Sequence, residues 1–314
     1  MPTAYLSHSA CLLHDMGPAH PESAARIQAI EARLVADGIL PRLARHEAPR
    51  ATREQLARVH TAEYIDAIVA AAPTHGLVYL DPDTAMNPHT LEAAERAAGA
   101  VVRATDLVIG GAAENAFCNV RPPGHHATRS AAMGFCIFNN VAVGVAHALA
   151  HHGLTRVAIA DFDVHHGNGT EDIFGDDPRV MLCSTFQHPF YPHCGAETVS
   201  DHIINVPLPA GTDGQGFRRA VLARWLPALE TFRPQMLFIS AGFDAHREDD
   251  MAHLALVEDD YVWVTEVLRD VANAHSGGRI VSSLEGGYAL SALGRSAAAH
   301  VGVLAGAARR PAGA

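Results

Sequence analysis

Apolar side chains recur at helical spacing in three stretches of the first third of the chain. Residues 22–35 repeat alanine, isoleucine, leucine and valine every three or four positions, and Gly38 follows as a stop signal. Residues 62–71 and 90–109 show the same period, and a glycine pair follows the second of them. Thr52–Gln55 has the spacing of a capping box. These patterns predict that the first third is helical.

From residue 115 onward, short apolar runs rich in strand-forming residues alternate with helical stretches. The runs cover residues 156–160, 180–183, 235–239 and 279–282, and the helical stretches cover residues 140–152, 217–230 and 259–274. This alternation predicts an α/β fold with a mostly parallel sheet and helices on both faces. No repeat or linker divides the chain, so we expect a single domain over residues 1–306 and a frayed tail over 307–314.

Polar motifs follow three of the predicted strands directly. Asp161–Asp163 follows the run at 156–160, Ser240–Asp244 follows the run at 235–239, and Glu285–Tyr288 follows the last run. The carboxyl ends of parallel strands meet at one edge of a sheet, which is where ligand sites gather in α/β folds. The three motifs are therefore predicted to form one site.

Two carboxylates and one imidazole in these motifs have the donor types that zinc prefers. Asp163 and His165 are two positions apart, so on an extended segment their side chains point the same way, and Asp244 completes the set. An isolated Asp-x-Asp-x-His is more often a solvated loop. The shared placement at strand ends favours a metal site here.

Two further motifs supply groups for proton transfer and for oxyanion binding. His125 and His126 follow Arg121-Pro-Pro-Gly, a stiff turn that fixes where both rings point. Tyr288 follows two glycines that allow close backbone approach, so its phenol is placed to donate to a developing oxyanion.

Composition and charge narrow the class of protein. The chain has 314 residues, a hydrophobic fraction of 48%, a charged fraction of 18% and a formal net charge of −11. The negative charge argues against nucleic-acid binding, which needs a basic face. The five cysteines form no Cys-x-x-Cys pair and are expected to be free thiols. No signal peptide or membrane-spanning run is visible, so we expect a cytoplasmic protein with no membrane contact.

The motifs together resemble the histone deacetylase and acetylpolyamine amidohydrolase family, and most closely its class II-like bacterial members. They are Arg-Pro-Pro-Gly-His-His, Asp-Phe-Asp-Val-His-His-Gly-Asn-Gly, Ser-Ala-Gly-Phe-Asp-Ala-His and Leu-Glu-Gly-Gly-Tyr, together with Gly134-Phe135. The resemblance implies an arginase/deacetylase-like fold and a zinc-dependent amidohydrolase that removes acetyl groups from acetyl-lysine of proteins or peptides through a metal-activated water. Fe²⁺ is the alternative metal.

The resemblance assigns a role to each catalytic residue. Asp163, His165 and Asp244 are the expected metal ligands, His126 is the general base and later acid, and Tyr288 is the oxyanion donor. His125 is the electrostatic partner of His126 and is oriented by Asp161. Asn168 orients His126 where one branch of the family has Asp, so His126 should titrate lower than in that branch.

Further residues are assigned by resemblance alone. Gly134, Phe135 and Tyr191 resemble the walls of the family's substrate tunnel, and Arg26 resembles the arginine near its acetate exit. A structural K⁺ is expected at Asp161, Asp163, His165, Ser184 and Thr185. Five remaining histidines are expected at the rim or surface: His188, His193, His202, His246 and His253.

The substrate and the assembly state stay open at this point. Polyamine-selective relatives carry a Glu that aligns with Met251, which favours acyl-lysine here, although Glu248, Asp249 and Asp250 lie close by. An acetylpolyamine deacetylase is the main alternative. A silent acyl-lysine binding module is disfavoured because no ligand or catalytic residue is missing, and an arginase would need ligands for two metals. A homo-oligomer is left open.

Overall fold

The computed structural model describes residues 1–306, so the predicted tail at 307–314 lies outside the described residues. An eight-stranded sheet forms its centre, and every neighbouring pair of strands runs parallel. The sheet is thus wholly rather than mostly parallel. In sheet order its strands are β2 (Ala44–Glu47), β1 (Ala4–Ser7), β5 (Asn115–Cys118), β10 (Ile280–Leu284), β9 (Met236–Ala241), β6 (Val157–Asp161), β7 (Val180–Gln187) and β8 (Ile203–Leu208).

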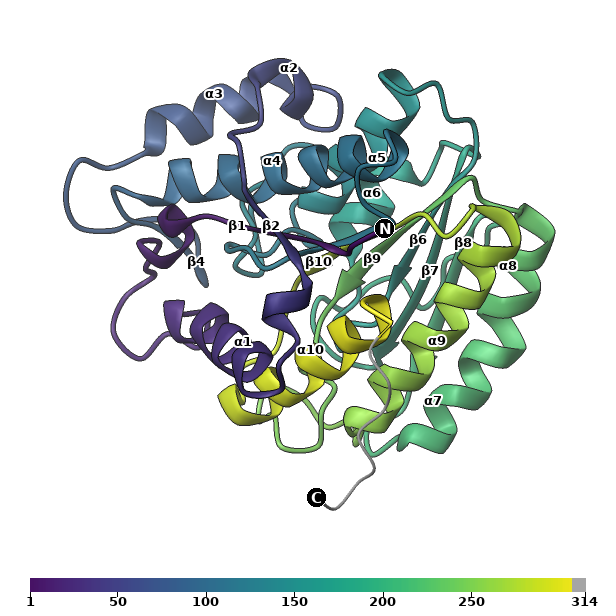
Figure 1. The fold of residues 1–314 in the computed structure, drawn as a ribbon. Helices are drawn as coiled ribbons and strands as arrows, with labels where there is room; N and C mark the ends of the chain where they lie inside the picture. The colour runs from purple at the N-terminus through teal and green to yellow at the C-terminus, as the bar shows by residue number, and fades with distance from the viewer. Residues whose placement is uncertain (307–314) are drawn as a thin grey trace.

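Helices cover both faces of this sheet (Figure 1). On one side lie α2 (Arg53–Leu56), α3 (Ala62–Ala71), α4 (Thr90–Ile109) and α5 (Asn140–Ala150). On the other lie α1 (Ala24–Ala36), α7 (Gly214–Ala220), α8 (Leu226–Phe232), α9 (Glu258–His275) and α10 (Leu290–Leu304). The remaining elements are α6 (Asn168–Phe174), the antiparallel hairpin β3 (Val78–Asp81) with β4 (Thr84–Met86), and the 3-10 turns Ser9–Leu12 and Leu40–Arg42.

The sheet separates two hydrophobic cores. Successive side chains of a strand point to opposite faces, so Val157 and Ile159 of β6 join the core under α4 and α5. Ala158 and Ala160 of the same strand join the core under α1, α9 and α10. Both faces of the strand are buried, which explains why its sequence is continuously apolar rather than alternating.

The helices predicted from periodicity lie close to their expected positions. The helices α3 and α4 have the predicted bounds, and α1 begins two residues later than the pattern suggested. The capping box at the start of α2 is present: Gln55 N donates to Thr52 Oγ1 at 3.2 Å and Thr52 N donates to Gln55 Oε1 at 2.8 Å. The stretch 217–230 is one helical segment whose middle, Val221–Trp225, is a π-helix.

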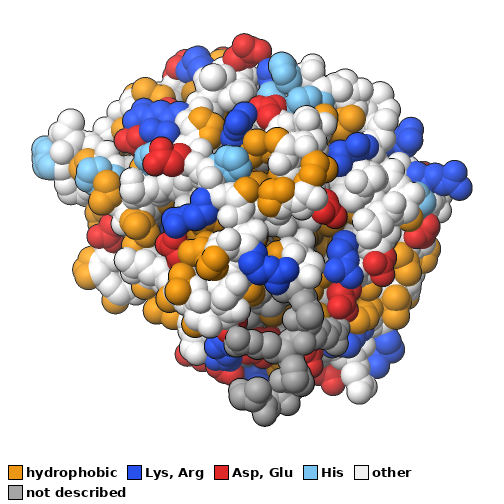
Figure 2. All heavy atoms as spheres, in the orientation of Figure 1, with side chains coloured by type: hydrophobic (Ala, Val, Ile, Leu, Met, Phe, Trp, Pro, Cys, Tyr) orange, Lys and Arg blue, Asp and Glu red, His pale blue; other side chains and the backbone are white. Residues whose placement is uncertain are grey.

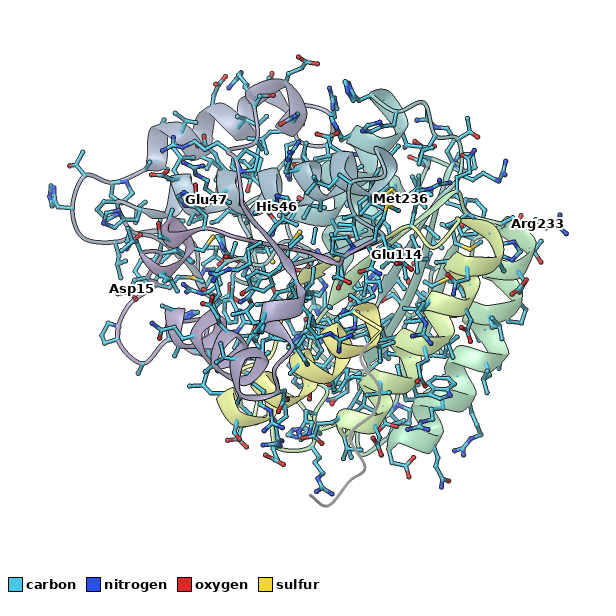
Figure 3. The ribbon with its side chains drawn as sticks, in the orientation of Figure 1. Asp15, His46, Glu47, Glu114, Arg233 and Met236 are labelled. Atoms are coloured by element: carbon cyan, nitrogen blue, oxygen red, sulfur yellow. The ribbon has the colours of Figure 1, made fainter. Side chains whose placement is uncertain are left out.

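Six strands were not among the runs predicted from the sequence. The strands β1, β2, β3 and β4 lie within the third of the chain expected to be helical, and β5 and β8 were not among the predicted runs. The strands β1 and β2 have four residues each, too few to show a period, and β8 contains Pro207. Figure 3 labels Glu114 and Met236, which stand at the amino ends of β5 and β9 and mark the sheet edge opposite the polar motifs.

Two other expectations can be compared with the structure. All five cysteines are free, and four of them are buried, with Cys194 exposed. Among the described residues, no helix is both long enough and apolar enough to cross a membrane.

Candidate active site

The predicted metal ligands come together at the carboxyl ends of two adjacent strands. His165 Nδ1 lies 3.1 Å from Asp163 Oδ1 and 3.3 Å from Asp244 Oδ2. All three side chains are buried, and one donor atom from each lies within 4.8 Å of the others. Asp244 Oδ1 accepts the Val164 N–H at 3.0 Å, whereas its Oδ2 makes no hydrogen bond to the described residues. A buried carboxylate oxygen without a donor suits a metal ion.

The charges of Asp163, His165 and Asp244 also favour a bound cation. Burial alone would lower the pKa of His165, but the carboxylates of Asp163 and Asp244 raise it to about 10. Burial and the neighbouring charge of Asp163 raise the pKa of Asp244 to about 6. Two buried carboxylates therefore share one positive charge, and a divalent ion in the same place would compensate both.

Gly286 packs closely against the predicted metal ligands, which is possible only because glycine has no side chain. A Cβ at this position would overlap the Asp244 carboxylate. Gly286 N donates to Asp163 Oδ2 at 2.8 Å, so the glycine backbone also fixes one ligand. Gly286 thus allows close packing against Asp163 and Asp244, in addition to the close backbone approach expected before Tyr288.

The two histidines of the stiff turn are held by different partners. His125 Nδ1 lies 2.9 Å from Asp161 Oδ2, and His126 Nδ1 lies 2.7 Å from Asn168 Oδ1. Both rings are buried, with centroids 4.1 Å apart. Each Nδ1 faces an oxygen acceptor, so each carries the proton and leaves Nε2 as the acceptor nitrogen in the neutral ring.

The pKa values of the two rings are shifted in opposite directions. Burial would lower the pKa of His125, but the charges of Asp161 and Asp163 raise it well above its usual value. Burial and the positive charges of His125 and His165 hold the pKa of His126 well below its usual value. The expectation that Asn168 makes this ring titrate lower than an Asp-backed one stays a prediction. His126 is thus the neutral member of the pair and His125 the charged one.

Tyr288 is held on a loop that contacts three other segments. Its backbone N–H donates to Asp249 Oδ2 at 2.6 Å, and the guanidinium of Arg26 lies 4.8 Å from its ring centroid. The ring of Phe135 meets it edge-on at 5.9 Å. Burial raises the pKa of Tyr288 well above its usual value, although Arg26 opposes the shift. The phenol stays protonated and can donate a hydrogen bond.

A pocket of about 220 Å³ leads to these groups. It is lined by Asp83, Pro123, His125, His126, Gly134, Phe135, Asp163, His165, Phe190, Tyr191, Met251, Gly286 and Tyr288. The three residues predicted as tunnel walls, Gly134, Phe135 and Tyr191, are therefore in its lining, together with Met251. The ring of Phe190 also stacks on that of His165, with centroids 5.7 Å apart and an interplanar angle of 26°.

Comparisons with known proteins place this site in a family. The description "Histone deacetylase domain" matches residues 20–304. The chain belongs to the histone deacetylase family. It is similar to the crystal structure of the HDA15 HD domain, with a TM-score of 0.91 and 36% identity, covering 99% of this chain and 90% of that one. Membership makes the protein a hydrolase of the deacetylase and amidohydrolase class.

Three similar proteins are named as an amidohydrolase, a probable deacetylase and a polyamine deacetylase. The histone deacetylase-like amidohydrolase of Pseudomonas aeruginosa is 37% identical over 310 residues, 91% of this chain and 81% of that protein. The probable deacetylase of Archaeoglobus fulgidus is 36% identical over 92% of this chain and 82% of that one. The polyamine deacetylase HDAC10 of Mus musculus is 37% identical over 82% of this chain and 40% of that one.

Arg26 is buried beside the site and binds the backbone of the family's tyrosine loop. It donates to Gly287 O at 2.6 Å and to Glu285 O, and it pairs with Glu22 Oε1 at 3.0 Å. These bonds fix the loop that carries Tyr288. A role at an acetate exit stays a prediction.

The predicted monovalent-cation residues lie in two adjacent strands, β6 and β7, and in the loop that follows β6. Asp161 of β6 is paired in register with Ser184 of β7, and Ser184 Oγ is buried without a hydrogen-bond partner among the described residues. Asp161 Oδ1 accepts the Asp163 N–H at 3.1 Å. The proximity of these groups agrees with a K⁺ site, which stays a prediction.

One histidine expected at the rim is in the interior. His246 is buried, its Nδ1 accepts the Glu248 N–H at 3.1 Å, and its Nε2 lies 3.5 Å from Glu258. Placing it at the rim was wrong, because the loop after β9 folds back to form a bridge between His246 and Leu256. The other four are half-buried or exposed, as expected: His188, His193, His202 and His253.

Three residues at the site were not identified from the sequence. Asp83 and Phe190 line the pocket, and Asp249 binds the tyrosine loop. Asp83 lies in the turn between β3 and β4 and accepts the Gly134 N–H at 3.1 Å. It is 42 positions before His125 in the printed sequence, and no local pattern links the two. The only sequence feature that could have pointed to Phe190 as a pocket residue is its position next to Tyr191.

Glu285 was quoted within its motif but given no role. Its Oε2 accepts the N–H groups of Gly124 at 2.7 Å and His125 at 3.1 Å, and its Oε1 accepts from Ser240 Oγ at 3.1 Å. Burial raises its pKa to about 7. Glu285 therefore ties the backbone of the histidine pair to the end of β10.

Proposed function

We propose that the protein is a zinc-dependent amidohydrolase that removes acetyl groups from acetyl-lysine side chains of proteins or peptides. The observation that carries the proposal is the meeting of three buried donor residues, Asp163, His165 and Asp244, beside a pocket that His126 and Tyr288 line. Family membership supports amide hydrolysis, and the donor set supports zinc.

Asp163, His165 and Asp244 would hold the metal. Their two carboxylates and one imidazole match a catalytic zinc site, which uses three protein ligands and keeps a position open. When bound, zinc would polarise the acetyl carbonyl and make the attacking water more acidic. The same residues could bind Fe²⁺, which accepts this donor set as well.

His126 would move the protons in this reaction. Its Nδ1 is bound to Asn168, so its Nε2 is the acceptor for a proton from the attacking water. The same nitrogen can then return the proton to the departing lysine amine. His125 is positively charged beside Asp161 and cannot accept a further proton, which favours an electrostatic role for it.

Tyr288 would donate to the carbonyl oxygen as its negative charge develops. Such a donor typically contributes about 2.7–4 kcal/mol to transition-state stabilisation. The contacts with Asp249 and Arg26 fix the loop before substrate arrives, so little reorganisation is needed.

The pocket walls support an extended alkyl chain as the substrate. The rings of Phe135 and Tyr191 are two of its walls, and aromatic walls bind methylene groups by apolar contact. Met251 lies in the lining and offers no charge for a second ammonium group. These features favour acetyl-lysine over an acetylpolyamine.

Acetylpolyamine hydrolysis is the second candidate, and one observation favours it. Asp83 also lines the pocket, and a carboxylate there would attract a distal amine. Its Oδ1 already accepts from Gly134 N and Thr84 Oγ1, which occupies part of its capacity. We therefore place acetyl-lysine first.

Steady-state kinetics on one zinc-loaded preparation tests the proposal. An acetyl-lysine peptide, acetylputrescine and acetylspermidine should all be compared by kcat/KM, and the peptide should have the highest value. Tyr288→Phe, prepared in parallel, should lose kcat by about 100- to 1,000-fold, which excludes a contaminating hydrolase. Absence of hydrolysis of all three substrates would contradict the enzymatic proposal.

The free cysteines bear on where the protein works. The unpaired thiols agree with a reducing compartment, and a cytoplasmic location is proposed on that basis.

A further inference from the structure

A second group of metal-binding side chains lies away from the pocket. It consists of Asp106, His147, His151 and His152, which we call the His/Asp cluster. Asp106 is in the last turn of α4, His147 is in the last turn of α5, and the other two follow α5 directly. No part of this cluster lines the active-site pocket.

The cluster lies at the opposite edge of the sheet from the active site. The chain runs from His152 into the amino end of β6, whereas Asp161 at the carboxyl end of that strand belongs to the catalytic group. Five strand residues span about 17 Å, so the two sites are separate. Histidine side chains gather beside acidic ones near the top of Figure 2, in the region where Figure 1 places α5.

The donor atoms of the His/Asp cluster converge on one carboxylate oxygen. His147 Nε2 and His152 Nε2 each lie 2.8 Å from Asp106 Oδ1. The ring of His151 stacks on that of His147 with centroids 4.8 Å apart, and it meets the His152 ring at 4.9 Å. One donor atom from each of the four residues lies within 4.8 Å of the others.

We propose that the His/Asp cluster is a second, structural binding site for a divalent transition-metal ion such as Zn²⁺. Three imidazoles and one carboxylate form a closed four-ligand set, which is typical of structural rather than catalytic zinc. Zinc binds nitrogen and carboxylate oxygen at about 2.0–2.2 Å, so its donors lie roughly 3–4 Å apart. His151 is exposed and Asp106 and His152 are half-buried, so these three side chains have room to move into that geometry around the buried His147.

The surroundings of the cluster favour a cation. The two helices end here, and the carboxyl ends of helices carry partial negative charge. Asp106 accepts the two Nε2–H groups in the metal-free form, so an ion bound at Nε2 would require the single proton of each neutral ring to move to Nδ1. Burial lowers the pKa of His147, which keeps its ring neutral and available as a ligand.

One neighbouring side chain competes with the metal. Arg58 Nη1 lies 2.9 Å from His147 Nδ1, and Arg58 Nη2 donates to Glu54 at 3.1 Å. A histidine that binds metal through Nε2 carries its remaining proton on Nδ1 and cannot accept from Arg58. Metal binding must therefore turn Arg58 away from His147 and towards Glu54. Removing Arg58 should tighten binding.

Zinc uptake by the full chain, with the active-site metal already loaded, tests the proposal. The protein is equilibrated with micromolar Zn²⁺, desalted and measured by elemental analysis. The wild type should retain two equivalents, and the double variant His151→Gln/His152→Gln should retain one. Both substituted side chains are at least partly exposed, so the variant should fold and hydrolyse substrate at the wild-type rate.

Two further variants test whether Arg58 competes with the metal and whether binding is specific to the His/Asp cluster. Arg58→Gln should bind the second equivalent at least tenfold more tightly in a zinc titration. The matched control is His275→Gln, because His275 also pairs with a carboxylate, Glu230, at 2.8 Å but has no further metal-binding neighbour in a described cluster. This control should keep two equivalents.

The wild type should also gain thermal stability from added zinc beyond the first equivalent, and the double variant should not. A wild type that retains only one equivalent, or a double variant that still retains two, would overturn the proposal.

Discussion

The carboxylate of Asp249 accepts the backbone N–H of Tyr288 at 2.6 Å and that of Ala289 at 2.9 Å. Its other oxygen accepts the Met251 N–H at 3.0 Å. Asp249 is buried, and it joins the loop that carries the proposed oxyanion donor to the loop that carries the pocket-lining Met251. In the sequence, Glu248, Asp249 and Asp250 were the alternative to position 251 for recognising a substrate amine. The structure instead gives Asp249 a positioning role, and Glu248 pairs with Arg295 at 2.9 Å.

Asp249→Asn should therefore lower kcat without loss of the active-site metal. The amide keeps one acceptor oxygen but turns the other into a donor, which opposes an N–H group of one of the two loops. We expect kcat to fall by at least tenfold with a smaller change in KM, measured on the acetyl-lysine peptide. Asp250→Asn is the matched control. The Asp250 carboxylate is next in sequence to Asp249 but is exposed, so this variant should leave kcat unchanged. Equal activity of the two variants would contradict the positioning role.

The proposed metal ligands can be tested by counting zinc. Asp244→Ala removes a ligand whose Oδ2 has no other donor, so it should abolish the active-site equivalent and the activity together. The count should be made in the His151→Gln/His152→Gln background, where the cluster at the ends of α4 and α5 does not contribute. Retention of a stoichiometric equivalent in this triple variant would refute the assignment. Circular dichroism should show that the protein remains folded.

The sequence predicted elements and motifs better than it predicted contacts between loops. The helix α4 had the expected bounds because twenty residues give several turns of a clear period. The meeting of Asp163, His165 and Asp244, the proposed metal ligands, was predicted because their motifs follow buried strands, which fixes their place in a parallel sheet. Asp83 and Asp249 were missed because their roles depend on how separate loops pack, and neither loop has a regular period. His246 was misplaced for the same reason.

A buried histidine outside the pocket lining makes stability depend on pH. His300 lies within an aromatic cluster, Nδ1 is 2.7 Å from Thr265 Oγ1, and Nε2 is 2.9 Å from Ser282 Oγ. Burial lowers its pKa from 6.5 to about 3. In the unfolded chain the ring takes up a proton below pH about 6.5, whereas the folded protein keeps it neutral until pH about 3. Its contribution to stability is therefore present above the unfolded pKa and is lost as the pH falls through this window.

Urea unfolding at several pH values measures this effect. Between pH 6 and pH 4 the free energy of unfolding of the wild type should fall by up to about 1.4 kcal/mol per pH unit more than that of His300→Gln. His253→Gln replaces an exposed histidine and should show the wild-type slope. The same slope in all three proteins would show that His300 takes no part in acid destabilisation.

Substrate choice should depend on the charge at position 251. Met251 lies in the pocket lining, where an apolar side chain cannot compensate a second ammonium group. Met251→Glu should raise kcat/KM for acetylspermidine relative to the acetyl-lysine peptide by at least tenfold, which is about 1.4 kcal/mol, because a partly desolvated carboxylate pairs strongly with an amine. Met251→Gln has nearly the same size without the charge and should leave the ratio within threefold of the wild type. An equal effect of Glu and Gln would show that shape rather than charge governs the change. A wild type that already prefers acetylspermidine would overturn the acetyl-lysine proposal, and Asp83 would then be the carboxylate to replace next, since Asp249 and Glu248 are held by other partners.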